Sequence, residues 1–542
     1  MCGRLDILGF ADALWARRLD AWTSDADTQE KIRNRLGWLS ASDAVAPHRE
    51  RLCALVESLR HSSLTDVVLL GMGGSSLAPE VLRQVLGVAP GYPRFQMLDS
   101  VDPAAVRSAF ERAKTSLFVL ASKSGSTIEP NAMAAEARAR VLASGEPNWS
   151  SRFIAITDEG TALHQRAVKE QFREIFVNPS DIGGRYSELS LFGMVPAALM
   201  GADVDRILTH AHAMEAACRD TNVRANPGLA LGAFMAAGAA IGRDKLTLLL
   251  SPSLLPLALW IEQLVAESTG KQGKGIVPIT DSFAPGAQLG SDCILVAAYG
   301  SDGPHARLLE PVRATGAPMF EIEVPDDLAI GAEFFRWEVA TATAGLLMGI
   351  NPFDEPNVKQ AKDATSALLE SYRTSGRLRA REPHGRIDGV TLTLSTAAEQ
   401  ELHGAGPEDF LGVLRPADYF GLLPYLPPDR DPFDSVLQEM RANIGAASGC
   451  ATALGYGPRY LHSTGQLHKG GRNNGVFIIV TAPADEDLPI PGEPYSFGIL
   501  EMAQALGDFE SLDRAGRRAL HVHLPRRDAG LLRRTFEKLL AH

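Results

Sequence analysis

The chain has 542 residues, of which 45% are hydrophobic, and a formal net charge of −12. This length predicts two or three domains with large buried cores, and the acidic balance without long runs of like charge argues against nucleic acid or a membrane surface as a partner. The five scattered cysteines, the lack of a long apolar segment and the start MCGRLDILGF, which is not a secretory signal, predict a cytoplasmic protein.

The first half of the chain alternates between strand and helix patterns. Residues 1–45 are expected to form a helical segment. Short buried strands separated by helices then predict a doubly wound parallel sheet with helices on both faces, a three-layer αβα domain over residues 46–220. The expected strands are 66–70, 95–98, 117–121, 152–156 and 174–177, and the expected helices are about 79–87, 103–113, 130–142 and 161–170.

The same alternation returns in the second half of the chain. A helical stretch at roughly 188–240 precedes strands at 246–250, 276–279, 293–298 and 319–324 and a long helix at about 331–349. We therefore predict a second α/β domain of the same class over residues 221–400. Residues 401–542 are expected to add a C-terminal α/β region, with strands YFGLLPYL and GVFIIVT around one helix and a basic helix at the end.

Two hydroxyl-rich loops follow strands of the first expected sheet. The apolar run 117–121 leads into Ser122, Lys123, Ser124, Gly125, Ser126 and Thr127, and a helix follows. Upstream, the strand 66–70 leads into GMGGSS and a second helix. Such loops offer N–H and O–H donors at a helix N-terminus, which suits a phosphate dianion. Each loop alone also fits an ordinary turn between strand and helix. A dinucleotide fingerprint is disfavoured because the G-x-G-x-x-G spacing is absent.

Several motifs taken together resemble one known family. GMGGSSLAP, SKSGST, DIGGRYSELSLFG (181–193), ESTGKQGKG (267–275) and STGQLHKGG (463–471) look like the successive motifs of glucose-6-phosphate isomerases. The resemblance runs from about residue 30 to the end and is strongest to the isomerase half of the bifunctional transaldolase–phosphoglucose isomerases. It implies a pair of sugar-isomerase domains and an aldose–ketose isomerase of glycolysis and gluconeogenesis that uses no metal and no organic cofactor.

Glu267 is the candidate catalytic base. Moving a proton between carbons 1 and 2 of a sugar phosphate through an enediolate requires a base, and a buried carboxylate with a raised pKa is suited to it. Glu267 ends an apolar helical run, where a solvent-exposed carboxylate is the structural alternative. The resemblance implies that Glu267 is the base and that Gln263, one helical turn earlier, contacts the substrate.

The resemblance also assigns two cations to the site. Arg185, which follows two glycines in GGRYS, matches the family arginine beside the base, where it would stabilise the enediolate. Its alternative role is an ion pair at a domain interface. Lys469 in QLHKGG matches the family lysine near the ring oxygen. The phosphate contacts carried over by motif are Gly74, Ser75, Ser122, Lys123, Ser124 and Thr127, and Lys123 alternatively is a solvated loop lysine.

The sequence does not decide which residue opens the sugar ring. Family members carry a histidine after the base, on a segment from the neighbouring subunit, and the stretch GAQLGSDCILVAAYG lacks one. His462, His468 and His305 are the candidates, although each also fits a structural position. His521 and His523 share one strand face without a cysteine or carboxylate cluster, which favours a structural role over a metal site.

Two other functions compete with this one. The phosphate loops do not select the sugar, so an isomerase of another phosphosugar is an alternative, as is a non-catalytic phosphosugar-binding module. Glu267 together with Arg185 disfavours the module. The expected partner is a small sugar phosphate, and a homodimer is compatible with the sequence. Transaldolase activity is not expected, because no barrel-sized domain precedes residue 30.

Overall fold

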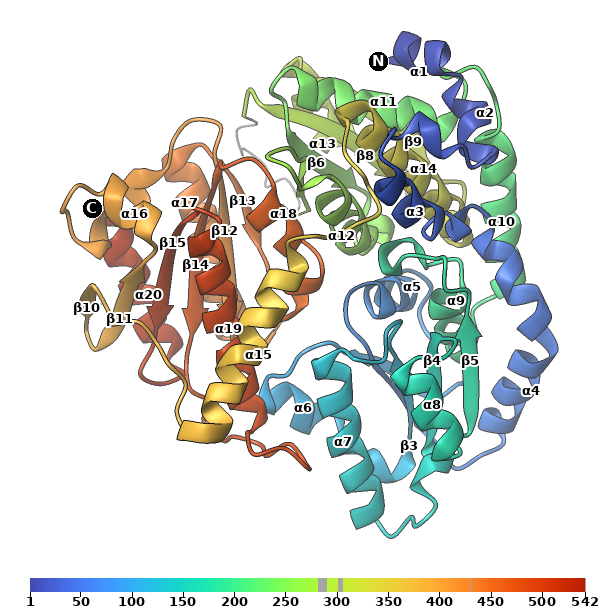
Figure 1. The fold of residues 1–542 in the computed structure, drawn as a ribbon, viewed down its shortest axis with the longest axis horizontal. Helices are drawn as coiled ribbons and strands as arrows, with labels where there is room; N and C mark the ends of the chain where they lie inside the picture. The colour runs from blue at the N-terminus through green and yellow to red at the C-terminus, as the bar shows by residue number, and fades with distance from the viewer. Residues whose placement is uncertain (281–289, 301–305, 429, 542) are drawn as a thin grey trace.

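The computed structural model describes the whole chain except residues 281–289, 301–305, 429 and 542. Figure 1 shows three lobes, each built on a β-sheet with helices around it, that meet near the middle of the molecule. The helices α1 (Cys2–Leu8), α2 (Phe10–Trp15) and α3 (Ala26–Arg33) lie against the lobe of the second sheet, whereas α4 (Arg49–Arg60) packs against α9 of the first lobe. The C-terminal end lies at the far side of the third lobe.

The first sheet is parallel, with the strand order β2-β1-β3-β4-β5. Its order reverses between β1 and β3, the point at which ligands bind in doubly wound sheets. The strands are β1 (Asp66–Leu70), β2 (Arg94–Leu98), β3 (Ser116–Ala121), β4 (Phe153–Asp158) and β5 (Glu174–Asn178). The helices of this lobe are α5 (Leu77–Leu86), α6 (Pro103–Ala109), α7 (Ile128–Ala143), α8 (Ala162–Lys169) and α9 (Leu191–Leu199).

Both faces of this sheet are buried, as its continuous apolar strands require. Val67 and Leu69 face a core that includes residues of α5 and α9, whereas Val68 and Leu70 face a core that includes residues of α6, α7 and α8. The expected three-layer αβα domain is therefore confirmed, with every expected strand present.

The second sheet is also parallel, with the order β7-β6-β8-β9. Its strands are β6 (Lys245–Leu250), β7 (Val277–Ile279), β8 (Cys293–Tyr299) and β9 (Met319–Glu323). Helix α14 packs against α10 and α11, and its apolar residues belong to the same core as the first face of the first sheet. The helices are α10 (Val204–Ala217), α11 (Pro227–Ala240), α12 (Leu257–Thr269), α13 (Ala306–Ala314) and α14 (Ile330–Met348).

The third sheet is mixed, with the order β10-β11-β15-β14-β12-β13; the β10–β11 and β11–β15 pairs are antiparallel and the other pairs are parallel. Strand β10 pairs with β11, and β11 pairs with β15. The third sheet therefore includes residues that precede the domain boundary expected at residue 400. The strands are β10 (Gly385–Ile387), β11 (Val390–Leu394), β12 (Tyr419–Tyr425), β13 (Ala451–Leu454), β14 (Gly475–Thr481) and β15 (Arg518–His523).

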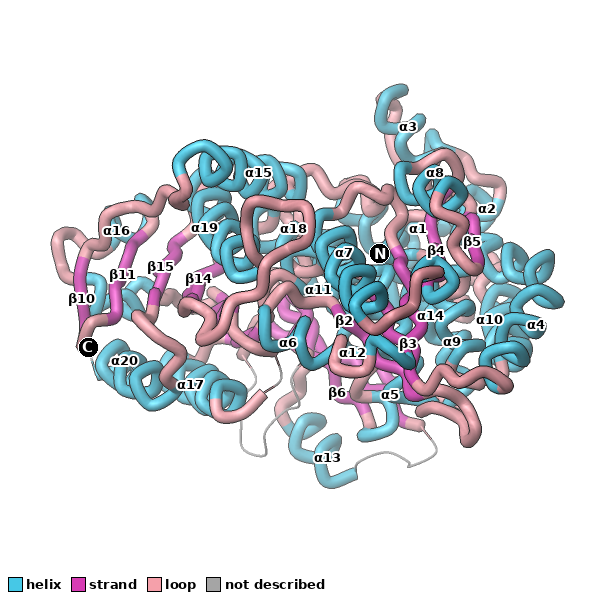
Figure 2. The backbone as a smooth tube through the Cα atoms, turned by 90° about the horizontal axis from the view of Figure 1, so that it is seen from below, coloured by secondary structure: helices cyan, strands magenta, loops and turns pink. Residues whose placement is uncertain are grey.

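Figure 2 shows α17 and α20 on one side of the third sheet and α15 and α19 on the other. The helix pair α15 and α19 connects the lobes, because Leu368 of α15 and Phe497 of α19 belong to the same core as Met133 of α7. None of the helices in the described part of the chain has the length and hydropathy of a membrane span. The helices of this lobe are α15 (Val358–Ser375), α16 (Thr396–Glu401), α17 (Phe433–Ser448), α18 (Gly465–Gly470), α19 (Phe497–Arg514) and α20 (Ala529–Ala541).

Candidate active site

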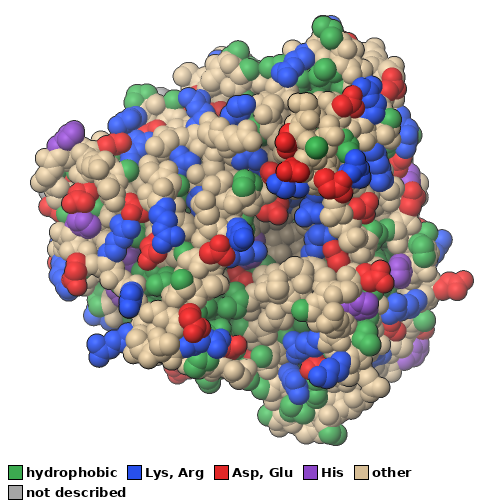
Figure 3. All heavy atoms as spheres, viewed as in Figure 1, with side chains coloured by type: hydrophobic (Ala, Val, Ile, Leu, Met, Phe, Trp, Pro, Cys, Tyr) green, Lys and Arg blue, Asp and Glu red, His purple; other side chains and the backbone are tan. Residues whose placement is uncertain are grey.

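A cavity of about 490 Å³ lies where the three lobes meet. Figure 3 shows a hollow near the middle of this face, with acidic and basic side chains around it. The first lobe contributes the loops after β1, β3 and β4, the second contributes α12, and the third contributes His462. Ten expected site residues line it: Gly74, Ser75, Ser122, Lys123, Ser124, Thr127, Arg185, Gln263, Glu267 and His462.

The two glycine-containing motifs are in direct contact at one wall. A Cβ atom on Gly74 would lie 1.9 Å from the carbonyl oxygen of Gly184. Gly74 therefore lets the loop after β1 pack against the loop that carries Arg185. The preceding Gly73 has φ of +56°, a conformation that other residues rarely adopt. These backbone contacts bring Ser75 and Arg185 to the same cavity.

The loop after β3 is held by its own hydrogen bonds. The Gly125 amide donates to Ser122 Oγ at 3.1 Å, and the Asn131 side-chain amide donates to the carbonyl oxygens of Gly125 and Thr127. Thr127 is the N-cap residue of α7, yet its hydroxyl makes no capping hydrogen bond. Its hydroxyl and the first amides of α7 are thus available to an anion.

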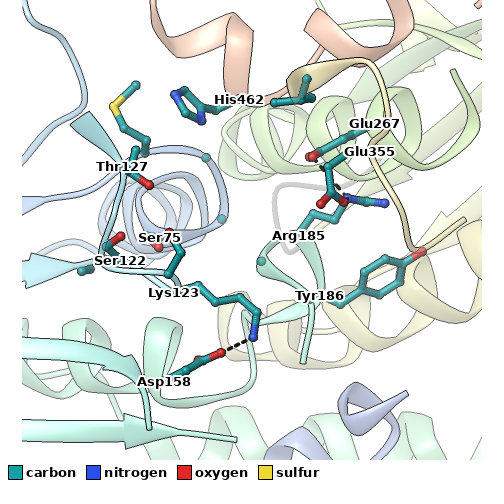
Figure 4. Close-up of a pocket in the computed structure, with 18 of the residues that line it drawn as sticks. Ser75, Ser122, Lys123, Thr127, Asp158, Arg185, Tyr186, Glu267, Glu355 and His462 are labelled. Carbon is teal, nitrogen blue, oxygen red and sulfur yellow. Dashed lines mark hydrogen bonds and ion pairs between the residues drawn. The ribbon is translucent and has the colours of Figure 1, made fainter. Parts of the chain in front are cut away.

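Lys123 forms an ion pair with Asp158 at the end of β4 and donates to the Ser180 carbonyl at 2.8 Å. Burial is the main cause that raises the pKa of Asp158, and Lys123 opposes it. The Lys123 side chain is 24% exposed, so it is neither a solvated loop lysine nor a free cation. Lys123 is thus fixed at the edge of the loop after β3 (Figure 4).

Opposite these loops, Arg185 lies between two carboxylates (Figure 4). Its Nη1 is 3.2 Å from Glu267 Oε1 and 3.0 Å from Glu355 Oε2. Its other nitrogens donate to Ser268 Oγ at 2.9 Å and to the Pro352 carbonyl at 2.9 Å. Every bond anchors the guanidinium, whose orientation is therefore set before a ligand binds. Arg185 does form an ion pair between lobes, and it lines the cavity as well.

Glu267 lies near the end of α12 and is 8% exposed. Gln263, one turn earlier, donates to Glu267 Oε2 at 3.3 Å and to the carbonyl oxygen of His462 at 2.8 Å. Burial is the main cause that raises the pKa of Glu267, Arg185 opposes it, and Glu355 adds to it. A carboxylate with increased proton affinity and access to a cavity has the properties of a general base.

His462 is the expected histidine that the fold brings to the cavity. Its Nε2 lies 2.9 Å from Glu129 Oε1, and Gln504 donates to the same oxygen at 2.6 Å. Burial alone would raise the pKa of Glu129, but the nearby His462 lowers it. Lys362 of α15 also lines the cavity, is exposed, and has no ion pair among the described residues. An oriented imidazole and an available ammonium therefore lie on one side of the site.

Lys469 and His468 are not brought to the cavity. The Lys469 side chain is 1% exposed, and its ammonium lies 2.6 Å from Asp508 Oδ1 of α19. His468 is buried among Tyr419, Tyr460 and Phe477, and burial is the main cause that lowers its pKa well below the ordinary value. The expected place of Lys469 next to the substrate is therefore at odds with its packing. His305 lies outside the described residues.

The sequence interpretation did not include four charged residues that line the cavity or support its lining: Glu129, Asp158, Glu355 and Lys362. Glu129 offered a signal, because it lies two residues after Thr127, in the first turn of the helix that follows a hydroxyl loop. Glu355 and Lys362 offered none, since they follow α14 in a segment without a glycine-rich or hydroxyl-rich pattern.

A second pair of carboxyl groups lies outside the cavity lining, near Arg185 in the chain. Glu188, three residues after Arg185, and Glu338 of α14 are both fully buried, and Trp260 Nε1 donates to Glu188. Burial raises the pKa of Glu188 to about 8 and that of Glu338 well above the ordinary carboxyl value. The two groups share protons rather than ionise together.

Comparison with known proteins finds relatives in both sequence and fold. Residues 52–305 match the family model described as phosphoglucose isomerase. The chain is 36% identical to the glucose-6-phosphate isomerase of Prochlorococcus marinus (strain NATL2A) over 348 residues, which is 56% of this chain and 66% of that relative. Over this region the chain is similar to the phosphoglucose isomerase family. It is 31% identical to the glucose-6-phosphate isomerase of Thermosynechococcus vestitus, and that match also spans 66% of the relative.

Solved structures extend the likeness to the fold. A hypothetical protein from Thermus thermophilus superposes with a TM-score of 0.54 at 24% identity, over 69% of this chain and 96% of that protein. A glucose-6-phosphate isomerase from Chlamydia trachomatis superposes with a TM-score of 0.53 at 19% identity, over 62% of this chain and 75% of that protein. At these identities the superpositions support the fold alone.

Proposed function

We propose that the chain interconverts glucose 6-phosphate and fructose 6-phosphate through an enediolate, the aldose–ketose isomerisation of glycolysis and gluconeogenesis. The observation that carries the proposal is the arrangement of Arg185 3.2 Å from the buried carboxylate of Glu267, across one cavity from two hydroxyl-rich loops at helix N-termini. A phosphate held by those loops leaves the other end of a six-carbon sugar facing Glu267 and Arg185.

The chemistry follows from the charges at that end of the cavity. Glu267 takes the proton from carbon 2 of the aldose and returns it to carbon 1. The oxygen on carbon 2 loses its hydroxyl proton and the oxygen on carbon 1 gains one, so the reaction moves two protons and a double bond and leaves the carbon skeleton intact. Negative charge develops on the two oxygens of the enediolate. Arg185 stabilises that charge, and because its guanidinium is already fixed, little reorganisation is needed as the charge forms.

Phosphate binding is assigned to Ser75, Ser122, Ser124, Thr127 and the amide of Gly74, with Lys123 as a fixed cation at the edge. The Thr127 hydroxyl without a capping bond supports this assignment, as does the N-terminus of α7, where the helix dipole favours an anion. These contacts are made in the substrate and in the transition state alike, so they determine binding more than turnover.

Ring opening is assigned to His462, one of the candidate histidines from the sequence. Its contact with Glu129 orients the imidazole next to the cavity, where it can donate or accept a proton. Lys362, in place of the sealed Lys469, is proposed as the cation next to the ring oxygen, because it lines the same side of the cavity as His462.

The finer likeness to the isomerase half of the transaldolase–phosphoglucose isomerases rests on the motifs alone and is proposed on that basis. A cytoplasmic location and a homodimer are proposed likewise from the family likeness. Among the described residues, no group of three or more His, Cys, Asp or Glu side chains is arranged to hold a metal ion.

A coupled assay tests the activity. Fructose 6-phosphate is supplied, glucose 6-phosphate is oxidised by its NADP-dependent dehydrogenase, and NADPH is followed by absorbance with EDTA present. We expect turnover in the wild type and none above background in Glu267→Gln. If the wild type isomerised another ketose phosphate but not fructose 6-phosphate, the proposed substrate would be wrong. If it bound sugar phosphates without converting any of them, the chain would be a binding module.

A further inference from the structure

A second cavity, of about 370 Å³, lies in the third lobe and shares no lining residue with the active-site cavity. One face of the third sheet forms its floor, α19 forms one wall, and the segment 378–383 together with Arg386 of β10 forms another. Its volume is within the range of small-molecule sites, roughly 300–1,000 Å³. Neither the proposed reaction nor the family match uses it.

The floor is polar because two histidines of β15 face the cavity. His521 is opposite Thr393 of β11, and His523 is opposite Thr391 of β11 and Thr481 of β14, so all share one face of the sheet. Thr481 Oγ1 lies 2.7 Å from His521 Nε2 and 2.8 Å from His523 Nδ1. His521 is only 7% exposed, yet it lines the cavity.

The shared threonine limits what the histidines present to a ligand. Burial is the main cause that lowers the pKa of both rings, that of His521 to about 3, so both are neutral. One hydroxyl has one hydrogen, so Thr481 donates to at most one ring and accepts from at least one. The ring that donates to Thr481 presents its other nitrogen as an acceptor, and a ring that accepts from Thr481 presents its other nitrogen as a donor. These remaining nitrogens are His521 Nδ1 and His523 Nε2, and neither has a hydrogen bond to another described residue.

The rim of the cavity is positively charged. Arg379, Arg381 and Arg386 line it, whereas Glu510 is the acidic residue among its lining side chains. Arg381 is bound to Asp513 at 2.5 Å, and its guanidinium lies 5.6 Å from the ring centroid of Phe509. Arg379 and Arg386 are exposed and have no ion pair among the described residues, so they are free to bind an anion.

The remaining wall is apolar. Met502, Leu506 and Phe509 lie on α19, and Leu506 and Phe509 are buried apart from the part that lines the cavity. An apolar wall opposite guanidinium groups suits a flat ring, which can stack on both. A bare inorganic anion would leave this wall and the histidine pair unused.

We propose that this cavity is a second binding site, for a small organic anion with a flat heteroaromatic ring, the chemistry of a nucleoside monophosphate. The ring lies against α19, its polar edge meets the remaining nitrogens of His521 and His523, and the phosphate binds Arg379 and Arg386. The site does not depend on the proposed isomerase activity, since it lies in another cavity.

Isothermal titration calorimetry of the full chain with AMP tests the site. Adenosine and inorganic phosphate, the two parts of AMP, are titrated separately. We expect saturable binding of AMP to one site and binding at least about tenfold weaker for each part. The double variant Arg379→Gln/Arg386→Gln should lose at least about tenfold in affinity. The control Arg377→Gln, an exposed arginine that does not line the cavity, should bind as the wild type does.

Absence of AMP binding at millimolar concentration would overturn the proposal. So would binding that survives the double arginine variant but is lost in Thr127→Val, because AMP would then occupy the active-site loops. Equal affinity for AMP and inorganic phosphate would overturn it as well, since the ring would contribute nothing. His521→Phe, which keeps the ring volume and removes the polar nitrogens, should weaken AMP more than it weakens phosphate.

Discussion

Two buried clusters of cation and carboxylate lie near the centre of the molecule, and they differ in access. In one, Arg185 is shared by Glu267 and Glu355, whose side chains are 11% and 40% exposed and line the cavity. In the other, Lys469 and Asp508 are 1% and 0% exposed. Both cations come from motifs that resemble one family. A motif match therefore identifies charged residues, but access to a cavity decides which of them can react.

The largest effect should come from removing the base of the open cluster. Glu267→Gln keeps the shape of the side chain and its contact with Gln263 but cannot accept a proton. Because general-base catalysis contributes about 10²–10⁴-fold, turnover should fall by at least that factor. Binding of a sugar phosphate and the urea midpoint should change little. Near-full activity in a folded Glu267→Gln would mean that another group is the base.

Changes to the buried pair of Lys469 and Asp508 should affect the free energy of unfolding rather than turnover. Lys469→Met leaves Asp508 buried without its cation, which costs about 3–5 kcal/mol in the free energy of unfolding. Lys469→Met/Asp508→Asn should recover part of that loss, since asparagine can still accept from Tyr460. Urea unfolding measures both. A stable Lys469→Met with abolished turnover would return Lys469 to the reaction.

The phosphate loop should contribute mainly to binding. Thr127→Val removes the uncapped hydroxyl at nearly constant volume, and a lost donor to a charged oxygen costs about 1.5–3 kcal/mol. We expect a KM raised at least about tenfold with little change in kcat. Thr374→Val, at an exposed position that does not line the cavity, is the matched control. An unchanged KM in Thr127→Val would place the phosphate elsewhere.

The smallest effect should be a shift in pH dependence. The charge of Glu355 raises the pKa of Glu267, so Glu355→Gln lowers that pKa. Because the ionised base is then present at lower pH, the acidic limb of kcat/KM should move to lower pH. The exposed Glu370→Gln, which is remote from the cavity, should leave the profile unchanged. A shift toward higher pH in Glu355→Gln would contradict the arrangement around Arg185.

The sequence predicted the framework better than the site. Continuous apolar runs such as 66–70 and 117–121 correspond to buried parallel strands, because only such a sheet buries both faces. The short strands β10 and β11 carry polar residues and join a distant strand, so no local pattern indicated their sheet. Lys469 was misleading because its partner Asp508 lies on a helix later in the chain that was not predicted. Glu355 reaches Arg185 only through the loop after α14.

The protonated pair of Glu188 and Glu338 makes the stability of the fold decrease with rising pH. Because the folded chain holds protons there that the unfolded chain has released, the free energy of unfolding falls as pH rises from the ordinary carboxyl range past about 8. The same rise in pH favours the ionised form of Glu267, the proposed base. A higher pH thus favours the proposed chemistry while it lowers the free energy of unfolding. The urea midpoint should decrease from pH 6 to pH 9, and Glu338→Gln should flatten that decrease.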